Sequence, residues 1–163
     1  MSPAGYSGTP QARKLGIKPG QRVALDAPPE GWALTGPLPE LAAGDHTESA
    51  DLIVAFFTTA QDLVARLPHL AERIYPAGIL WIAWPRRAAG HVSDLTDVIV
   101  RARVLELGLV DTKIAAIDDD WSGQKAVWRV INRTTPSPPP RNARFLVDVP
   151  VPRRRQPPDP RSR

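Results

Sequence analysis

Two runs of consecutive apolar residues constrain the fold of this chain more than any other feature of its sequence. They span residues 52–57 and 79–84, and each has the length of a strand. A strand that is apolar on both faces must be covered on both, which is typical of a parallel sheet held between two layers. The sequence therefore predicts an α/β domain with these two strands inside its sheet.

A helix is predicted between the two runs. Thr59 is followed three residues later by Asp62, which resembles a capping box, and leucine or isoleucine recurs at 63, 67, 70 and 74. These spacings place the apolar side chains on one face of a helix. Pro68 lies inside this segment and is expected to kink or divide the helix, because proline lacks the backbone N–H that a helix uses.

The next segment predicts a second helix and a hairpin. Ser93 is expected to cap the helix and Gly108 to end it, with apolar residues at 95, 98, 102 and 105 on the buried face. Residues 109–117 and 125–131 are predicted strands, and the connection between them has the length of a hairpin loop.

The segment before the first run predicts only one more strand. A short helix over residues 11–15 is expected to stop at Gly16, and residues 22–26 are expected to form the strand. Residues 27–50 show no clear period and leave room only for a short helix near 31–34. The alternation predicts a Rossmann-like, three-layer fold with a mostly parallel sheet of about five strands and a terminal antiparallel hairpin.

Composition divides the chain into a domain and a tail. The chain has 163 residues, and we assign residues 1–131 to one domain with its own core. Residues 132–163 carry eight arginines, two acidic residues and nine prolines, so their net charge is +6, whereas residues 1–131 sum to −2. This predicts a disordered tail in which residues 145–151 can add a strand to a sheet edge. The arginines at 153–155 are a candidate contact for nucleic acid or another acidic surface.

Composition also excludes several classes of chemistry. The chain has no cysteine, which excludes disulfides, thiolate metal sites and thiol catalysis. No apolar run approaches the roughly 20 residues that span a membrane, and the first residues lack the features of a signal peptide. We therefore expect a cytoplasmic protein without membrane contact. The three histidines and the adjacent acids at 118–120 lack metal-ligand spacing, so we predict no metal site, and we name no catalytic residue.

Part of the chain resembles the class I S-adenosylmethionine methyltransferases. The turn Tyr75-Pro76-Ala77-Gly78 and the apolar run after it are similar to the stretch that leads into their fifth strand. Residues 108–128 are similar to their closing antiparallel hairpin. This resemblance covers residues 51–131 and implies a Rossmann-like fold.

A second resemblance covers most of residues 4–130. It is to the uncharacterised bacterial domain-of-unknown-function family 3052 (DUF3052), and it implies no activity. The segments that carry it are 4–10, 14–20, 22–25, 80–85, 94–96, 108–111 and 121–123. The chain departs from that family at Asp26-Ala27, where a glycine-containing approach to the following turn is expected.

The turn after the first strand argues against the methyltransferase cofactor. Methyltransferases need a glycine-rich turn there, because the backbone passes close to S-adenosylmethionine, but this chain places Pro28 and Pro29 in it. The 24 residues of segment 27–50 are too few for the missing strands and helices at roughly 30 residues per strand–helix–strand unit. We therefore predict no cofactor, without excluding S-adenosylmethionine. We also predict an occluded loop at Pro28-Pro29 and no cleft large enough for a nucleoside.

Ligands of open parallel sheets bind at the carboxyl ends of the strands. Four segments are expected at that edge, namely residues 26–31, 58–59, 84–87 and 118–123. Together they bring two indoles near two arginines, and these side chains suit a small anionic ligand or a docking partner. The candidate ligand residues are Asp26, Thr58, Trp84, Arg86, Arg87, Asp118, Trp121 and Ser122. The alternative is that both tryptophans fill the core and both arginines are solvated.

These observations favour a non-enzymatic Rossmann-like module that binds a small ligand or a protein partner. The alternative is a diverged S-adenosylmethionine-dependent methyltransferase or a related transferase. That alternative requires Asp26 or Glu30 to be free to hold the cofactor, and it requires Trp84 to line the pocket.

Overall fold

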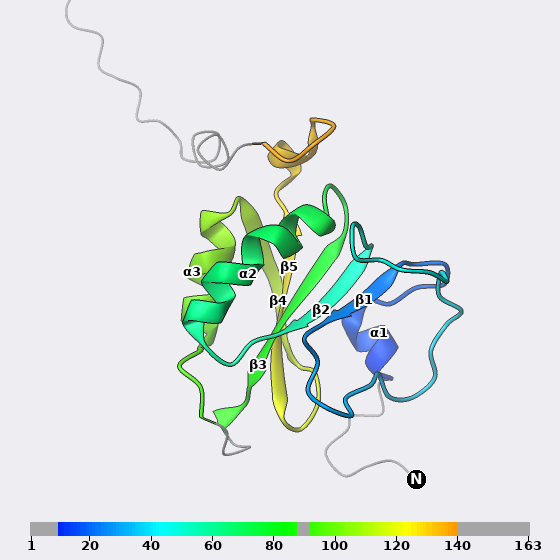
Figure 1. The fold of residues 1–163 in the computed structure, drawn as a ribbon, viewed down its shortest axis with the longest axis vertical. Helices are drawn as coiled ribbons and strands as arrows, with labels where there is room; N and C mark the ends of the chain where they lie inside the picture. Colours follow the sequence, from blue (N-terminus) through cyan, green and yellow to red (C-terminus); the bar gives the residue numbers. More distant parts are fainter. Residues whose placement is uncertain (1–9, 88–91, 140–163) are drawn as a thin grey trace, which may run out of the picture.

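The computed structural model describes residues 10–87 and 92–139, which form three layers (Figure 1). The central layer is a five-stranded sheet in the order β1-β2-β3-β5-β4. β1, β2 and β3 are parallel, and β5 runs antiparallel to β3 and β4. The predicted mostly parallel sheet with a terminal hairpin is confirmed. The strands are β1 (Val23–Asp26), β2 (Leu52–Phe56), β3 (Ile79–Pro85), β4 (Leu109–Ala116) and β5 (Trp121–Trp128).

Each face of the sheet has its own core. Helices α2 (Ala60–Arg73) and α3 (Asp97–Glu106) cover one face, where they pack against Ile82 and Trp84 of β3. Helix α1 (Gln11–Leu15) covers the other face, over Trp81 and its neighbours. All five residues of β2 are buried, as expected for a strand covered on both faces.

Helix α2 begins as the sequence predicts. The Thr59 hydroxyl accepts the Asp62 backbone N–H at 3.1 Å, and the four apolar residues at 63, 67, 70 and 74 are buried. The helix continues through Pro68 and is not divided there. The carbonyl that loses its partner at a proline belongs to the residue four positions earlier, here Val64, which lies on the exposed side where water can replace the bond.

The predicted start and buried face of α3 are wrong. Its N-cap is Thr96 rather than Ser93, and the Thr96 hydroxyl accepts a backbone N–H of the first turn at 3.3 Å. Val100 and Val104 are fully buried, whereas Val98 is 72% exposed. Apolar residues lie on both sides of this helix, so their spacing alone does not define which side packs on the sheet.

Strand β1 forms one edge of the sheet, because residues 27–50 contain no further strand. The helix predicted near 31–34 is absent: that segment is a turn followed by irregular backbone. Backbone bonds fasten the connection to the segment before β1, from Gly20 N–H to the Glu40 carbonyl at 2.8 Å and from Ala42 N–H to the Gln21 carbonyl at 3.0 Å. An irregular segment thus makes up the whole connection from β1 to β2.

Ordered contacts continue past residue 131, where we placed the end of the domain. Val130–Arg133 form a short 3₁₀ helix, and the buried Asn132 donates to the Gly108 carbonyl at 2.9 Å. The Tyr75 hydroxyl donates to the Thr135 carbonyl at 2.6 Å. The strand predicted at 145–151, the arginines at 153–155 and residues 1–9 lie outside the described residues.

Candidate functional site

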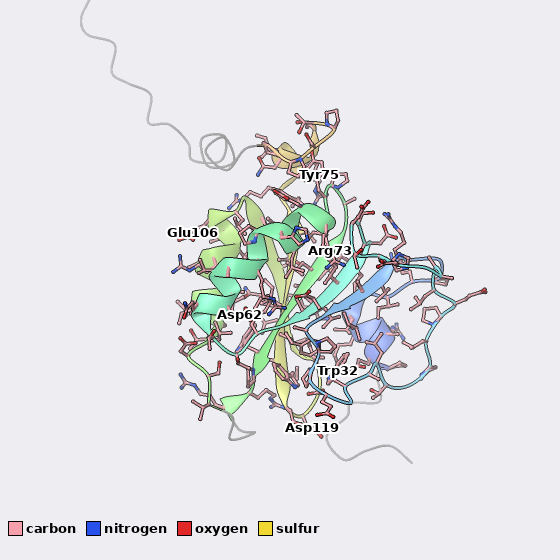
Figure 2. The ribbon with its side chains drawn as sticks, viewed as in Figure 1. Trp32, Asp62, Arg73, Tyr75, Glu106 and Asp119 are labelled. Atoms are coloured by element: carbon pink, nitrogen blue, oxygen red, sulfur yellow. The ribbon has the colours of Figure 1, made fainter. Side chains whose placement is uncertain are left out.

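The carboxyl ends of β1, β2, β3 and β4 lie at one edge of the sheet. Trp32 and Asp119 are at this edge, and Arg73 and Tyr75 are near the opposite one (Figure 2). Two hollows open along the carboxyl edge, with volumes of about 310 and 500 Å³. Both volumes fall in the range of about 300–1,000 Å³ that is typical of small-molecule sites.

The first hollow lies over the ends of β1 and β2. Its walls combine aromatic, proline, hydroxyl and charged side chains: Ala27, Pro29, Phe56, Thr58, Asp62, Arg66 and Trp121. The predictions of an occluded loop at Pro28-Pro29 and of no nucleoside-sized cleft are therefore wrong. Pro29 forms part of the wall of the hollow and does not fill it.

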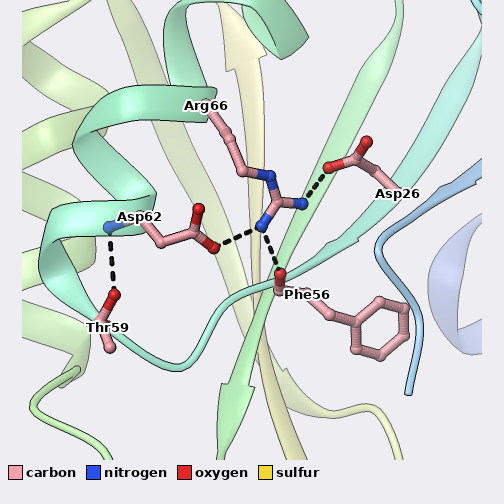
Figure 3. Close-up of polar contacts among 5 residues, drawn as sticks. All are labelled: Asp26, Phe56, Thr59, Asp62 and Arg66. Carbon is pink, nitrogen blue, oxygen red and sulfur yellow. Dashed lines mark hydrogen bonds and ion pairs between the residues drawn. The ribbon is translucent and has the colours of Figure 1, made fainter. Parts of the chain in front are cut away.

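Arg66 of α2 is the centre of the polar network in the first hollow (Figure 3). One terminal nitrogen, Nη1, donates to the Phe56 carbonyl at 2.9 Å and to the Asp62 carboxylate at 2.6 Å. The other, Nη2, donates to the Asp26 carboxylate. The guanidinium also lies 4.3 Å from the centre of the Phe57 ring, in cation–π contact. Arg66 thereby joins the ends of β1 and β2 to α2.

Two carboxylates keep Arg66 charged. Burial works to lower the pKa of Arg66, but the hydrogen bonds to Asp26 and Asp62 outweigh burial and raise the pKa above its ordinary value. The hollow therefore contains a permanent cation with two anions beside it. Such a set of charges matches a ligand that carries both signs of charge.

An aromatic row of Trp32, Phe56 and Trp121 lies beside the first hollow, and Phe56 and Trp121 of this row form its other wall. The Phe56 ring meets Trp32 edge-on with ring centres 4.7 Å apart, and it meets Trp121 edge-on at 5.0 Å. The Trp32 indole N–H donates to the Asp118 carboxylate at 2.8 Å. The second Asp118 oxygen accepts the backbone N–H groups of residues 120 and 121, so Asp118 fixes the β4–β5 turn.

Ala27 adopts a backbone conformation that favours glycine. Its φ is +50°, in the left-handed region, immediately after β1. A Cβ in this region costs about 1–2 kcal/mol. The residue that follows β1 thus has the left-handed backbone conformation that glycine adopts most readily, although it is alanine.

The second hollow lies over the ends of β3 and β4. Its apolar wall includes Trp84, only 6% of whose surface is exposed, together with Leu95 and Ile114. Its polar groups include Arg86, Arg87, Ser122, Thr96 and Asp97. The Arg86 backbone N–H donates to the Asp120 carbonyl at 2.8 Å, which fixes the segment that carries both arginines.

The structure divides the predicted ligand residues between the two hollows. Thr58 and Trp121 line the first, beside Asp26, whereas Trp84, Arg86, Arg87 and Ser122 line the second. Antiparallel pairing explains the separation of the two indoles: Trp84 pairs with Ser122, while Trp121 pairs with Pro85. Neighbouring residues of a strand point to opposite faces, so Trp84 and Trp121 belong to different cores.

The network around Arg66 was missed from the sequence. Its spacing of four residues from Asp62 indicates a helical ion pair and is readable from the sequence. Its bond to Asp26, 40 residues earlier, depends on how β1 meets α2 and has no sequence signal. Trp32 was missed for the same reason, since its partner Asp118 is 86 residues away.

Two further findings concern the described part of the chain. No group of three or more histidine, aspartate or glutamate side chains in residues 10–87 and 92–139 is arranged to hold a metal ion. Within the same ranges, no helix combines the length and the apolar character needed to cross a membrane.

No protein-family model matches the chain, and no curated protein matches it by sequence. Among solved structures, it is similar to magnesium protoporphyrin IX methyltransferase from Synechocystis PCC 6803 with bound S-adenosylmethionine, at 10% identity and a TM-score of 0.48, over 73% of this chain and 74% of that one. It is also similar to an O-methyltransferase from neocarzinostatin biosynthesis in complex with S-adenosylmethionine, at 14% identity and a TM-score of 0.42, over 56% and 34%. A third is LepI with S-adenosylhomocysteine and a substrate analogue, at 12% identity and a TM-score of 0.44, over 72% and 39%.

These comparisons contradict two predictions made from the sequence, namely that the chain is a non-enzymatic module and that it takes no cofactor. The solved structures that it matches include methyltransferases with bound S-adenosylmethionine or S-adenosylhomocysteine. The strand order is that of a Rossmann-like α/β fold with a closing antiparallel hairpin, as predicted. The resemblance to DUF3052 gains no support from a family model and stays a prediction.

Proposed function

We propose that the protein is a diverged S-adenosylmethionine-dependent methyltransferase, or a related transferase, that holds its cofactor in the first hollow. One observation carries the proposal: a guanidinium, two carboxylates and aromatic rings converge on a hollow of about 310 Å³ at the carboxyl ends of β1 and β2. This is the edge at which open parallel sheets bind their ligands.

The charges of the first hollow fit the charges of S-adenosylmethionine. The amino-acid end of the cofactor carries an ammonium and a carboxylate. Asp26 and Asp62 are acceptors for the ammonium. Arg66 has five N–H donors, and its Nε–H and one Nη2–H have no acceptor among the described residues, which leaves both for the carboxylate.

The aromatic row fits the rest of the cofactor. Trp121 of this row is partly exposed, and its face suits both a flat adenine ring and the positive sulfonium, because aromatic faces attract cations. When bound, the cofactor supplies an electrophilic methyl group. The aromatic side chains then exclude water from it, and Arg66 holds its carboxylate end in place.

One part of the usual cofactor site has no counterpart in the sheet. Methyltransferases take the acid for the ribose hydroxyls from a second strand, but β1 is the sheet edge here. The alternative derived from the sequence required Asp26 or Glu30 to be free to hold the cofactor and Trp84 to line the pocket. Asp26 binds Arg66 through Oδ2, and its Oδ1 has no partner among the described residues. Trp84 lines the second hollow and not the first. Glu30 is exposed in the turn beside Pro29, and we assign the ribose hydroxyls to it.

Calorimetric titration of the full chain with S-adenosylmethionine and S-adenosylhomocysteine tests the proposal. We expect saturable binding to the unchanged protein, a loss of about tenfold or more in Trp121→Ala, equal to about 1.4 kcal/mol, and a change within about threefold in Trp121→Phe. Ile131→Ala, which shortens an exposed side chain away from both hollows, is the control. Absence of saturable binding of either compound up to about 1 mM would overturn the proposal.

The predictions about cellular location, membrane contact and the basic tail are not affected by the structure. A cytoplasmic location, the absence of membrane contact and an association of the basic tail with nucleic acid or another acidic surface stay predictions. Because Asn132 and Thr135 bond to the domain, a deletion that tests the tail should begin after residue 139. Undiminished retention of that shortened chain on immobilised nucleic acid would contradict the role of the tail.

A further inference from the structure

We propose that the second hollow binds the acceptor substrate, and that this substrate is a small molecule with an apolar body and one oxyanion, either a carboxylate or a phosphate. The term acceptor rests on the proposed transferase function, whereas the binding of an oxyanion does not. Two arginines without a carboxylate partner and an apolar wall carry the inference.

The two arginines of the second hollow are not held by carboxylates of the described residues. Within the described residues, neither Arg86 nor Arg87 forms an ion pair. The Arg86 side chain makes a long contact, 3.4 Å from Nη1 to the backbone carbonyl of Asp119. A guanidinium with open donors binds a carboxylate or phosphate through two parallel hydrogen bonds. The hollow therefore offers two such forks to an incoming anion.

The other charged group of the hollow is already engaged. Asp97 stands in the first turn of α3, where a negative charge is favourable, and its carboxylate accepts the Val98 backbone N–H at 3.0 Å. The Thr96 hydroxyl caps the same helix by accepting the Ile99 N–H. The start of α3 is thus satisfied by its own side chains, and the attraction for an anion comes from Arg86 and Arg87.

The size and lining of the hollow require more than a simple ion. A volume of about 500 Å³ is that of a site for an organic molecule, and Trp84, Leu95 and Ile114 provide an apolar surface for its body. Ile114 is 53% exposed, which is unusual for isoleucine. A ligand that covers Ile114 and pairs with the arginines would bury apolar surface and charge together.

Gln124 is a buried amide without hydrogen-bond partners beside the second hollow. Its side chain is fully buried, and neither its Nε2 nor its Oε1 has a hydrogen-bond partner. It lies one pleat inward from Ser122 on the same face of β5, opposite Ile82. Because Gln124 pairs across the sheet with Ile114, which lines the hollow, its amide lies next to the hollow but not on its surface.

Nuclear magnetic resonance titration of the full chain with benzoate, phenyl phosphate and benzamide tests the inference. We expect both anions to shift the Nε–H signals of Arg86 and Arg87 and the Trp84 indole signal saturably, with dissociation constants on the order of 1 mM. Benzamide, which has the same ring without the charge, should bind at least about tenfold more weakly. The stronger of the two anions identifies the source of the oxyanion. No saturable shift at these groups, or equal shifts from benzamide, would sink the inference.

A matched pair of double variants separates a built site from general attraction. Arg86→Gln with Arg87→Gln should weaken both anions about tenfold or more, whereas Arg101→Gln with Arg103→Gln, which removes the same charge from α3, should change binding within about twofold. Equal losses in both pairs would refute the site.

Calorimetry with S-adenosylmethionine on the same proteins keeps the two proposals apart. We expect Arg86→Gln with Arg87→Gln to bind S-adenosylmethionine as the unchanged protein does. Cofactor binding without anion binding overturns this inference alone. Anion binding without cofactor binding supports the site and overturns the transferase function, and with it the term acceptor.

Discussion

The two hollows at the carboxyl edge treat their arginines in opposite ways. Arg66 in the first hollow is held by two carboxylates and a carbonyl, whereas Arg86 and Arg87 in the second have no ion-pair partner in the described part of the chain. An arginine that is paired with carboxylates joins elements of the fold, whereas an arginine without an ion pair attracts an anion. The comparison indicates that the first hollow suits a ligand of mixed charge and the second a ligand with net negative charge.

The same substitution in both hollows should give the largest difference. Arg66→Met leaves Asp26 and Asp62 without their shared cation, so we expect the free energy of unfolding to fall by about 2 kcal/mol. Arg86→Met removes an arginine without an ion pair and should change the free energy of unfolding by less than about 0.5 kcal/mol. Urea denaturation measures both. Similar losses from the two variants would erase the distinction between the hollows.

Two buried glutamines extend the comparison to uncharged groups. Gln124 beside the second hollow has no partners, so Gln124→Leu should raise the free energy of unfolding by about 1 kcal/mol. Gln11 is equally buried, but it donates to the Ile117 carbonyl at 3.0 Å and accepts the Thr35 N–H at 2.7 Å. Gln11→Leu should therefore lower the free energy of unfolding by about 1–2 kcal/mol. A loss in both variants would mean that ordered water satisfies Gln124.

The turn beside the first hollow should be improved by glycine. Ala27→Gly relieves a left-handed residue, and we expect a gain of up to about 1 kcal/mol, whereas Ala27→Val should be destabilising because a β-branched side chain tolerates this conformation poorly. Ala33→Gly, at a residue without positive φ in the same connection, is the control and should be slightly destabilising. Thermal unfolding ranks the three. A loss of stability in Ala27→Gly would show that the turn carries no strain.

The smallest effect is expected at the opposite end of the sheet, where an exposed ion pair joins Arg22 to Asp51 at 3.0 Å. Hydrogen bonds from Arg22 lower the pKa of Asp51 in the folded state. The pair therefore stabilises the fold above the ordinary pKa of aspartate, near pH 4, and its contribution is lost as the pH falls through the lowered pKa. Asp51→Asn should lower the free energy of unfolding by about 0.5 kcal/mol at pH 7, and this difference should disappear as the pH falls through the lowered pKa of Asp51. A difference in the free energy of unfolding that persists in acid would rule out the ion pair as its cause.

The sequence predicts those parts of the fold that depend on local pattern. The apolar run of β2 and the Thr59 cap of α2 were predicted correctly, because a fully buried strand and a helix cap each leave a signal within a few residues. The start of α3 was misplaced, because Ser93 and Thr96 are both plausible caps and only packing decides between them. Ser93 instead donates to the Thr58 carbonyl at 2.8 Å.

The candidate site was predicted only as an edge of the sheet. The rule that ligands bind at the carboxyl ends of strands points to the edge at which both hollows lie. The division into two hollows follows from the register of β3 against β5, which pairs Trp84 with Ser122. Register is a long-range property, so a single sequence cannot reveal that Trp84 and Trp121 point to opposite faces.

The hydrogen bond from the Trp32 indole to Asp118 has a practical consequence. It ties the segment after β1 to the β4–β5 turn, so the wall of the first hollow cannot swing outward without breaking it. An indole that leaves a carboxylate for bulk solvent changes its fluorescence emission. The protein thus carries an intrinsic optical probe of wall opening, and a Trp32→Phe variant supplies the background signal of the other four tryptophans.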